Sequence, residues 1–129
     1  MTSAVLDASA LLALLRGEPG GQRVRPCLAD AAMSALNWAE VVGYYSRSGA
    51  SEQDIRALLE PLPIDRVPFD ETMAYIAGMM LPVTRAAGLS LGDRACLALA
   101  KHLSLKVLTA DRPWKNLGAT LGVDVELIR

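Results

Sequence analysis

Short apolar runs along the chain alternate with longer stretches in which apolar residues recur at helical spacing. The short runs predict buried strands, and the periodic stretches predict helices that pack one face against them. The clearest apolar stripe, at i, i+3, i+4 and i+7, consists of Trp38, Val41, Val42 and Tyr45. The predicted strands are Thr2–Leu6, Ala31–Ser34, Ile64–Phe69, Lys106–Thr109 and Val123–Ile128. The predicted helices are Ala8–Arg16, Gln22–Asp30, Leu36–Ser48, Ser51–Leu59, Asp70–Ala87 and Ser90–His102.

Prolines interrupt two of these helices. Pro26 lies in the early part of the second one, and Pro82 should kink or split the helix over residues 70–87. Residues 111–114, Asp-Arg-Pro-Trp, are expected to turn the chain. Because strands alternate with helices, the sequence predicts an α/β fold, a three-layer α/β/α sandwich with a central parallel sheet covered on both faces.

The composition is that of a globular protein. The chain has 129 residues, of which 52% are hydrophobic and 21% charged, so we expect a single domain over residues 1–129 with a core of its own. The formal net charge is −1, which excludes a basic field over the whole molecule. Any contact with nucleic acid must therefore come from a local patch.

The cysteines and the single histidine narrow the possible chemistry. Cys27 and Cys96 lack metal-ligand spacing, and His102 alone argues against histidine-dependent catalysis. The sequence has no signal-peptide pattern and no apolar run long enough for a membrane span, which predicts a cytoplasmic protein with reduced thiols. Any chemistry must therefore rest on carboxylates.

Two carboxylates follow predicted strands. Asp7 comes directly after the first strand, and Asp111 follows the strand over residues 106–109 with one alanine between them. Ligands bind beyond the carboxyl ends of the strands in such sheets, so both acids should lie on one rim. Each also has a simpler interpretation, since Asp7 is a favoured N-cap for the next helix and Asp111 can form an Asx turn.

Glu40 and Asp93 lie on helices that can border this rim. Glu40 falls opposite the apolar stripe of its helix, as either a solvated surface residue or a cleft wall would. Asp93 comes three residues after Ser90, as in a capping box. Four acids around one rim repel one another unless a cation is present, and Mg²⁺ or Mn²⁺ suits such oxygen ligands. An ion held there can activate a water and stabilise the charge that develops on a phosphodiester.

Four segments carry a family resemblance: VLDASALLALL, SALNWAEVVGYY, LSLGDRACLALA and VLTADRPW. In this order and spacing they resemble the PIN-domain ribonucleases, and in particular the VapC toxins of bacterial VapBC toxin–antitoxin pairs. The resemblance covers essentially the whole chain. It implies a PIN-like fold, hydrolysis of RNA with Mg²⁺ or Mn²⁺, a homodimer, and a cognate antitoxin.

The resemblance also implies roles for the matching acids. Asp7 and Asp93 would be the principal metal ligands, and Glu40 and Asp111 would complete the site, partly through waters. All four would be catalytic, and Asp111 or Glu40 would orient the attacking water. Many family members carry one more acid beyond the last of these, where this chain has Asn116.

Smaller polar residues and several cations accompany the acids. Ser9 matches a small polar residue that often supports the first acid in the family, and Thr109 matches the hydroxyl residue two positions before the last acid. We expect both to be supporting residues. Trp114 could stack on a base, although a tryptophan at such a position is usually part of the core. Several cations near the motifs could contact RNA phosphates, be ordinary surface cations, or pair with the same four acids. They are Arg16, Arg94, Arg112 and Lys115.

Two other interpretations stay open. One is a PIN-like domain that has lost its activity and serves only as a binding module, although all four acids are retained. The other is a different Mg²⁺-dependent phosphoryl hydrolase, although Asp7-Ala8-Ser9 lacks the second aspartate of the aspartyl-nucleophile phosphatases. The sequence contains neither GxxxxGK[ST] nor GxGxxG, so nothing supports a P-loop or dinucleotide-binding domain.

Overall fold

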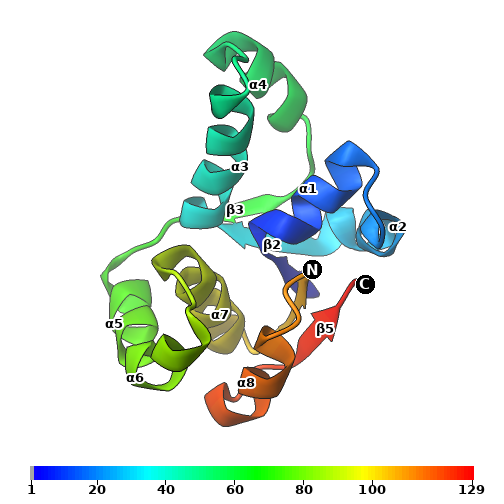
Figure 1. The fold of residues 1–129 in the computed structure, drawn as a ribbon. Helices are drawn as coiled ribbons and strands as arrows, with labels where there is room; N and C mark the ends of the chain where they lie inside the picture. The colour runs from blue at the N-terminus through cyan, green and yellow to red at the C-terminus, as the bar shows by residue number, and fades with distance from the viewer. Residues whose placement is uncertain (1) are drawn as a thin grey trace.

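A parallel five-stranded sheet forms the centre of the protein in a computed structural model that describes residues 2–129 (Figure 1). Met1, which the predicted domain includes, lies outside the described residues. The strand order is β3-β2-β1-β4-β5, and each neighbouring pair is parallel. The strands are β1 Ala4–Leu6, β2 Ala31–Ser34, β3 Asp65–Val67, β4 Lys106–Thr109 and β5 Val125–Leu127.

Helices cover both faces of this sheet (Figure 1). Successive strand residues point to opposite faces, so Val5 joins a core with α5, α7 and α8, whereas Leu6 joins a second core with α1, α3 and α4. Two cores on opposite faces of one sheet confirm the predicted three-layer α/β/α sandwich. The helices are α1 Ala8–Arg16, α2 Gly21–Val24, α3 Ala35–Arg47, α4 Glu52–Leu59, α5 Glu71–Met79, α6 Leu81–Thr84, α7 Leu91–Leu103 and α8 Trp114–Leu121.

The strand order creates a topological switch point between β1 and β4. From β1 the sheet extends through β2 to β3 on one side and through β4 to β5 on the other. β1 and β4 pair directly, with Leu6 opposite Leu108. Asp7 follows the carboxyl end of β1 and Asp111 follows that of β4, so both acids border the crevice in which open α/β sheets bind ligands.

The prolines act differently in the two helices that they interrupt. The predicted helix Gln22–Asp30 was wrong in type: α2 ends at Val24, and residues Arg25–Asp30 form a 3₁₀ helix. Pro26 causes this change, because it lacks the amide hydrogen that would continue an α-helical ladder. The predicted break at Pro82 is confirmed, since this residue lies in the first turn of α6 after the end of α5.

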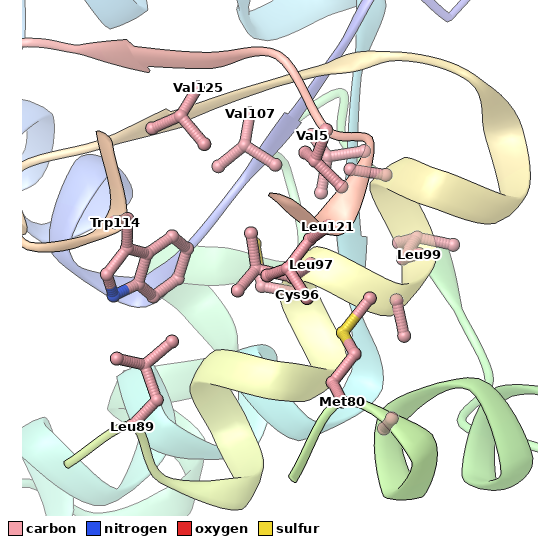
Figure 2. Packing of buried hydrophobic residues seen from close by; sticks show 14 of the residues in the cluster. Val5, Met80, Leu89, Cys96, Leu97, Leu99, Val107, Trp114, Leu121 and Val125 are labelled. Atoms are coloured by element: carbon pink, nitrogen blue, oxygen red, sulfur yellow. The ribbon is translucent and has the colours of Figure 1, made fainter. Parts of the chain in front are cut away.

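The helix α8 has no counterpart among the predicted elements, because the sequence pattern predicted only a turn over residues 111–114. Trp114 begins this helix and is fully buried, and Leu121, seven residues later, packs into the same core. Figure 2 shows the Trp114 ring within this cluster, together with Val107 and Val125 of the sheet. The core interpretation of Trp114 is therefore correct, and its ring does not face solvent where a base could stack.

Both cysteines are free thiols: Cys96 is buried in the core on α7, and Cys27 is half-buried.

Within residues 2–129, no helix has both the length and the apolar character that crossing a membrane requires.

Candidate active site

Four carboxylates line one pocket at the switch point. They are Asp7, Glu40, Asp93 and Asp111, the same acids that the sequence analysis selected, and we call the space between them the acidic pocket. Its volume is about 300 Å³. Asp7 is buried, Asp93 and Asp111 are half-buried, and Glu40 is exposed. The remaining lining residues are Ala8, Ser9, Ala110 and Arg129.

Asp7 is the most deeply buried of these acids, with 5% of its surface exposed. Its Oδ1 atom accepts hydrogen bonds from the Ala10 amide at 2.8 Å and from the Ser9 hydroxyl at 2.7 Å. Its Oδ2 atom accepts one from the Thr109 hydroxyl at 2.6 Å. The side chain is thus at once the N-cap of α1 and a wall of the acidic pocket, so both interpretations of its sequence position hold.

Ser9 and Thr109 connect the segments that follow β1 and β4. Ser9 Oγ accepts a hydrogen bond from the Ala110 amide at 3.0 Å, and Thr109 Oγ1 accepts one from the Asp111 amide at 3.0 Å. Since each hydroxyl also donates to Asp7, the backbone that carries Asp111 is held in place relative to the Asp7 carboxylate. Such contacts are expected of residues that support the Asp7 and Asp111 carboxylates.

Burial raises the pKa of Asp7 from 3.8 to about 6, because the charged carboxylate loses its hydration. The hydrogen bonds from Thr109, Ser9 and Ala10 oppose this rise, and the negative charge of Asp93 adds to it. A cation in the acidic pocket would stabilise the ionised carboxylate against both unfavourable effects.

Asp93 lies in the first turn of α7, and Ser90 is the N-cap of that helix. Ser90 Oγ accepts from the Asp93 amide at 3.1 Å, and Asp93 Oδ2 accepts from the Ser90 amide at 2.9 Å. The capping box that the sequence suggested is therefore present. The partial positive charge at the helix N-terminus also favours an anionic side chain here. Asp93, like Asp7, caps a helix and lines the acidic pocket.

Glu40 reaches the acidic pocket from α3, and a residue that the sequence analysis did not select holds it there. Asn37 is 1% exposed, and its Nδ2 atom donates to Glu40 Oε1 at 2.9 Å and to the Gly92 carbonyl at 2.9 Å. The signal that could have identified Asn37 was its position three residues before Glu40, because such residues are neighbours on a helix.

Arg129 is a cation that lines the acidic pocket and that the sequence analysis missed. Its Nη1 atom donates to the Pro19 carbonyl at 2.9 Å and lies 3.7 Å from Glu18 Oε1. Arg129 follows β5, and only the pairing of β5 with β4 brings it near the acids. No motif or spacing in the sequence could have indicated this placement.

The predicted RNA-binding cations lie outside the set of residues that line the acidic pocket. Arg94 Nη1 donates to a carbonyl of α5 at 3.0 Å, and Lys115 Nζ donates to a carbonyl of β5 at 2.6 Å. Arg16 is exposed at the end of α1 and pairs with Glu18. Arg112 is exposed directly after Asp111. Contact with RNA stays a prediction for all four.

The donor set of the acidic pocket suits a hard divalent cation. All four groups are carboxylates, and Mg²⁺ binds few protein oxygens directly while it keeps several waters. The carboxylates surround the space rather than converge on one point: within residues 2–129, no three His, Cys, Asp or Glu side chains come together closely enough to form a metal cluster. Waters between ion and carboxylate can bridge such distances, so the residues fit a hydrated ion.

A larger cavity, of about 490 Å³, lies between α3 and α4. Trp38 and Ile55 contribute to its apolar wall, and the Arg66 guanidinium lies 4.2 Å from the centroid of the Trp38 ring. None of the four acids lines it. The smaller acidic pocket, which all four acids line, is therefore the candidate active site.

Comparison with known proteins indicates the family and the fold of this chain. The family model described as "PIN domain" matches residues 4–119. A chain of a toxin–antitoxin complex from Klebsiella pneumoniae has a TM-score of 0.71 and 23% identity, with 98% of both chains covered. A chain of DNA-bound VapBC from Salmonella typhimurium has a TM-score of 0.73 and 16% identity, with 100% of both chains covered. VapBC-1 from nontypeable Haemophilus influenzae gives a TM-score of 0.69 at 20% identity over 98% of both chains. No curated protein sequence matches the chain.

These findings agree with the resemblance drawn from the four sequence segments. At such low identities the solved structures show the fold alone, and they cover the chain almost completely. The family match is independent of them, and all four acids of the acidic pocket lie within its residues. Because the family model spans most of the sequence, this chain belongs to the PIN domain family.

Proposed function

We propose that this protein is a metal-dependent endoribonuclease that hydrolyses RNA phosphodiester bonds, and that it is the toxin of a type II toxin–antitoxin pair. The observation that carries the proposal is the acidic pocket, in which Asp7, Glu40, Asp93 and Asp111 meet at the switch point of a PIN domain. Nuclease activity is the chemistry of this family, and RNA as substrate is our inference.

Mg²⁺ or Mn²⁺ is the proposed cofactor. Asp7 and Asp93 would be its principal ligands, and Glu40 and Asp111 would complete the site, partly through waters. When bound, such an ion supplies a positive charge that stabilises the negative charge developing on the phosphate. The raised pKa of Asp7 supports this assignment, because the pocket holds a carboxylate whose charged form needs a cation.

The chain's own residues would prepare and carry out the hydrolysis. Ser9 and Thr109 hold the Asp7 carboxylate in place by donating to it. Glu40 and Asp111 are less buried than Asp7, and they would orient the attacking water and accept its proton. Attack at phosphorus breaks the bond to the 3′ oxygen, which takes up a proton, so the products carry 5′-phosphate and 3′-hydroxyl ends. Since water is the nucleophile, the reaction does not require the 2′-hydroxyl of RNA.

Cations around the acidic pocket would contact the phosphates of the RNA. Arg112 is the best placed of the predicted set, because it is exposed and adjacent to Asp111. Arg16, Arg94 and Lys115 would add to the same field. If these contacts form, binding weakens steeply as the salt concentration rises.

We further propose a homodimer and a cognate antitoxin as partners. The matched structures from Klebsiella pneumoniae and Salmonella typhimurium are toxin–antitoxin complexes, which supports an antitoxin for this chain. The homodimer rests on the family resemblance of the four sequence segments.

A cleavage assay tests the proposed activity. The purified protein, freed of any antitoxin, is incubated with total cellular RNA in Mg²⁺, Mn²⁺ or EDTA, beside the variants Asp7→Asn and Asp93→Asn. Asp54→Asn is the matched control, because Asp54 is exposed on α4. We expect discrete fragments that require metal, persist in Asp54→Asn and disappear in the other two variants.

The same assay distinguishes the alternatives. Identical results with and without metal, and in all variants, would refute catalysis by the acidic pocket and leave an inactive binding module. Metal-dependent release of phosphate from a small phosphomonoester, without RNA cleavage, would indicate a different phosphoryl hydrolase. Equal cleavage of single-stranded DNA would widen the substrate class beyond RNA.

A further inference from the structure

We propose that Asn37 is a positioning residue that holds the Glu40 carboxylate in the acidic pocket, and that Gly92 provides the space in which this carboxylate lies. The inference rests on the proposed function and deepens it, because it adds one residue from α3 and one from α7 that act through Glu40 rather than on the substrate.

The Asn37 amide bridges two helices. Both acceptors of its Nδ2 group are known: Glu40 Oε1 at 2.9 Å on the same helix, and the Gly92 carbonyl at 2.9 Å in the first turn of α7. Neither acceptor can donate a hydrogen bond, so only one orientation of the amide satisfies them. This orientation links the Glu40 carboxylate to the helix turn that carries Asp93.

The same orientation leaves a buried oxygen without a partner. Asn37 is 1% exposed, and its Oδ1 atom has no hydrogen-bond partner among the described residues. An unpaired buried amide oxygen destabilises the fold, and a leucine of nearly the same shape would avoid this. The presence of asparagine here is thus unfavourable for packing and favourable for holding Glu40.

The space at Gly92 gives a second, independent observation on the same carboxylate. A Cβ atom at Gly92 would lie 2.5 Å from Glu40 Oε2 and 2.8 Å from Glu40 Cδ. Gly92 has no positive φ angle, and alanine is the better helix former, so the backbone does not require glycine here. The carboxylate of Glu40 occupies the volume that a side chain would fill.

These two contacts confine Glu40 between a donor and a surface. Asn37 draws Oε1 towards α7, and Gly92 lets the rest of the carboxylate pack against that helix. The separation between Glu40 and Asp93, the next residue after Gly92, is then set by the chain rather than by the flexible glutamate side chain. An exposed glutamate acquires a defined place in this way.

The substitutions Gly92→Ala and Asn37→Leu test the proposal in the intact protein. Gly92→Ala displaces only the end of a flexible side chain, so the fold should survive with an unchanged or higher melting temperature. We expect kcat for RNA cleavage to fall about 10- to 100-fold in each variant, the range typical of residues that orient metal ligands, with KM changed less than about twofold.

Matched controls separate positioning from packing. Gly78→Ala adds a methyl group to a helical glycine of α5 that has open space around it, and Gln53→Leu replaces an exposed amide side chain of α4. Both should leave kcat unchanged. In a Glu40→Ala background, Gly92→Ala should have no further effect, because its effect acts through Glu40. Additive losses would overturn this part of the proposal.

Mn²⁺ binding, measured by calorimetry, distinguishes a failure of the proposed nuclease function from a failure of the proposed positioning of Glu40. If the wild type binds Mn²⁺ but cleaves no RNA, the proposed function fails, and a roughly tenfold loss of Mn²⁺ affinity in Gly92→Ala and Asn37→Leu still supports positioning. Wild-type kcat and Mn²⁺ affinity in both variants would overturn the proposal, even if Asn37→Leu unfolds at a lower temperature. A wild type that binds no Mn²⁺ would overturn both hypotheses.

Discussion

The substitution Asp7→Asn removes a charge that the fold holds in an unfavourable place. The pKa of Asp7 is about 6 in the folded protein, against an ordinary value of 3.8. Between these pH values the folded state therefore binds a proton that the unfolded state releases. At about 1.4 kcal/mol per pH unit, the contribution of Asp7 to the free energy of unfolding of the metal-free wild type should fall by about 3 kcal/mol in total as the pH rises from well below 4 to well above 6.

The variant should lack this loss. Asparagine keeps an oxygen that can accept from Ser9 and Ala10, and it carries no charge at any pH in the range. The assay is urea unfolding in EDTA at unit intervals from pH 4 to pH 8, and the measured quantity is the free energy of unfolding of the variant minus that of the wild type. This difference should rise by about 2.5 kcal/mol from pH 4 to pH 8, because at pH 4 the unfolded chain has already released part of its proton. Asp54→Asn, which changes an exposed acid, serves as the control and should show no comparable rise.

Two outcomes would refute this reasoning. If the difference stays constant within about 0.5 kcal/mol, Asp7 titrates in the folded protein as it does in the unfolded chain, and burial does not raise its pKa. If the difference falls as the pH rises, the hydrogen bonds from Thr109, Ser9 and Ala10 outweigh the loss of hydration, and the sign of the pKa shift is wrong.

Three further predictions concern metal binding, the Thr109 hydroxyl and the Trp114 ring. Mn²⁺ at 100 times its Kd should raise the free energy of unfolding of the wild type by about 2.7 kcal/mol, and EDTA or Asp7→Asn should remove this gain, as urea unfolding can measure. Thr109→Val should lower the free energy of unfolding by about 2 kcal/mol, because valine leaves Asp7 Oδ2 without its donor and the Asp111 amide without its acceptor. Thr109→Ser keeps the hydroxyl and should lower the free energy much less. Equal losses in the two variants, measured by urea unfolding, would contradict this explanation. Trp114→Ala should lower the free energy of unfolding by about 3–5 kcal/mol and Trp114→Phe by less, because the buried Nε1 atom has no hydrogen-bond partner among residues 2–129. RNA cleavage per folded molecule should be unchanged in both variants.

General rules of sheet architecture were enough to predict that two of the acids lie on the same rim. Asp7 and Asp111 follow strands, and parallel strands present their carboxyl ends on one rim, so their proximity did not depend on knowing any loop. The position of Asp93 could be predicted from the capping box with Ser90, which marks the start of α7 within a few residues of sequence. For Glu40 the pattern alone allowed either a cleft wall or an open surface, and only the fold shows that it lines the acidic pocket.

The features that the sequence analysis missed depend on contacts between distant segments. The helix α8 is short, contains Gly118 and ends at Gly122, so few apolar residues mark its helical period. The turn that Pro113 predicts was the stronger signal in this part of the sequence. Arg129 reaches the acidic pocket because β5 is the neighbour of β4. The bond from Asn37 to Gly92 joins residues 55 positions apart, and no local pattern encodes such a pair.

The hydrogen bond between Thr109 and Asp7 spans 102 positions of the chain, which has a consequence for synthesis on the ribosome. Translation proceeds at about 5–20 residues per second, so Thr109 is added roughly 5–20 s after Asp7. During that interval β1 lacks its neighbour β4, and the acidic pocket has only part of its wall. The nascent chain is therefore inactive until most of it has been made, and a cell that makes a nuclease of this design has that interval for a partner to arrive before the nuclease can cut.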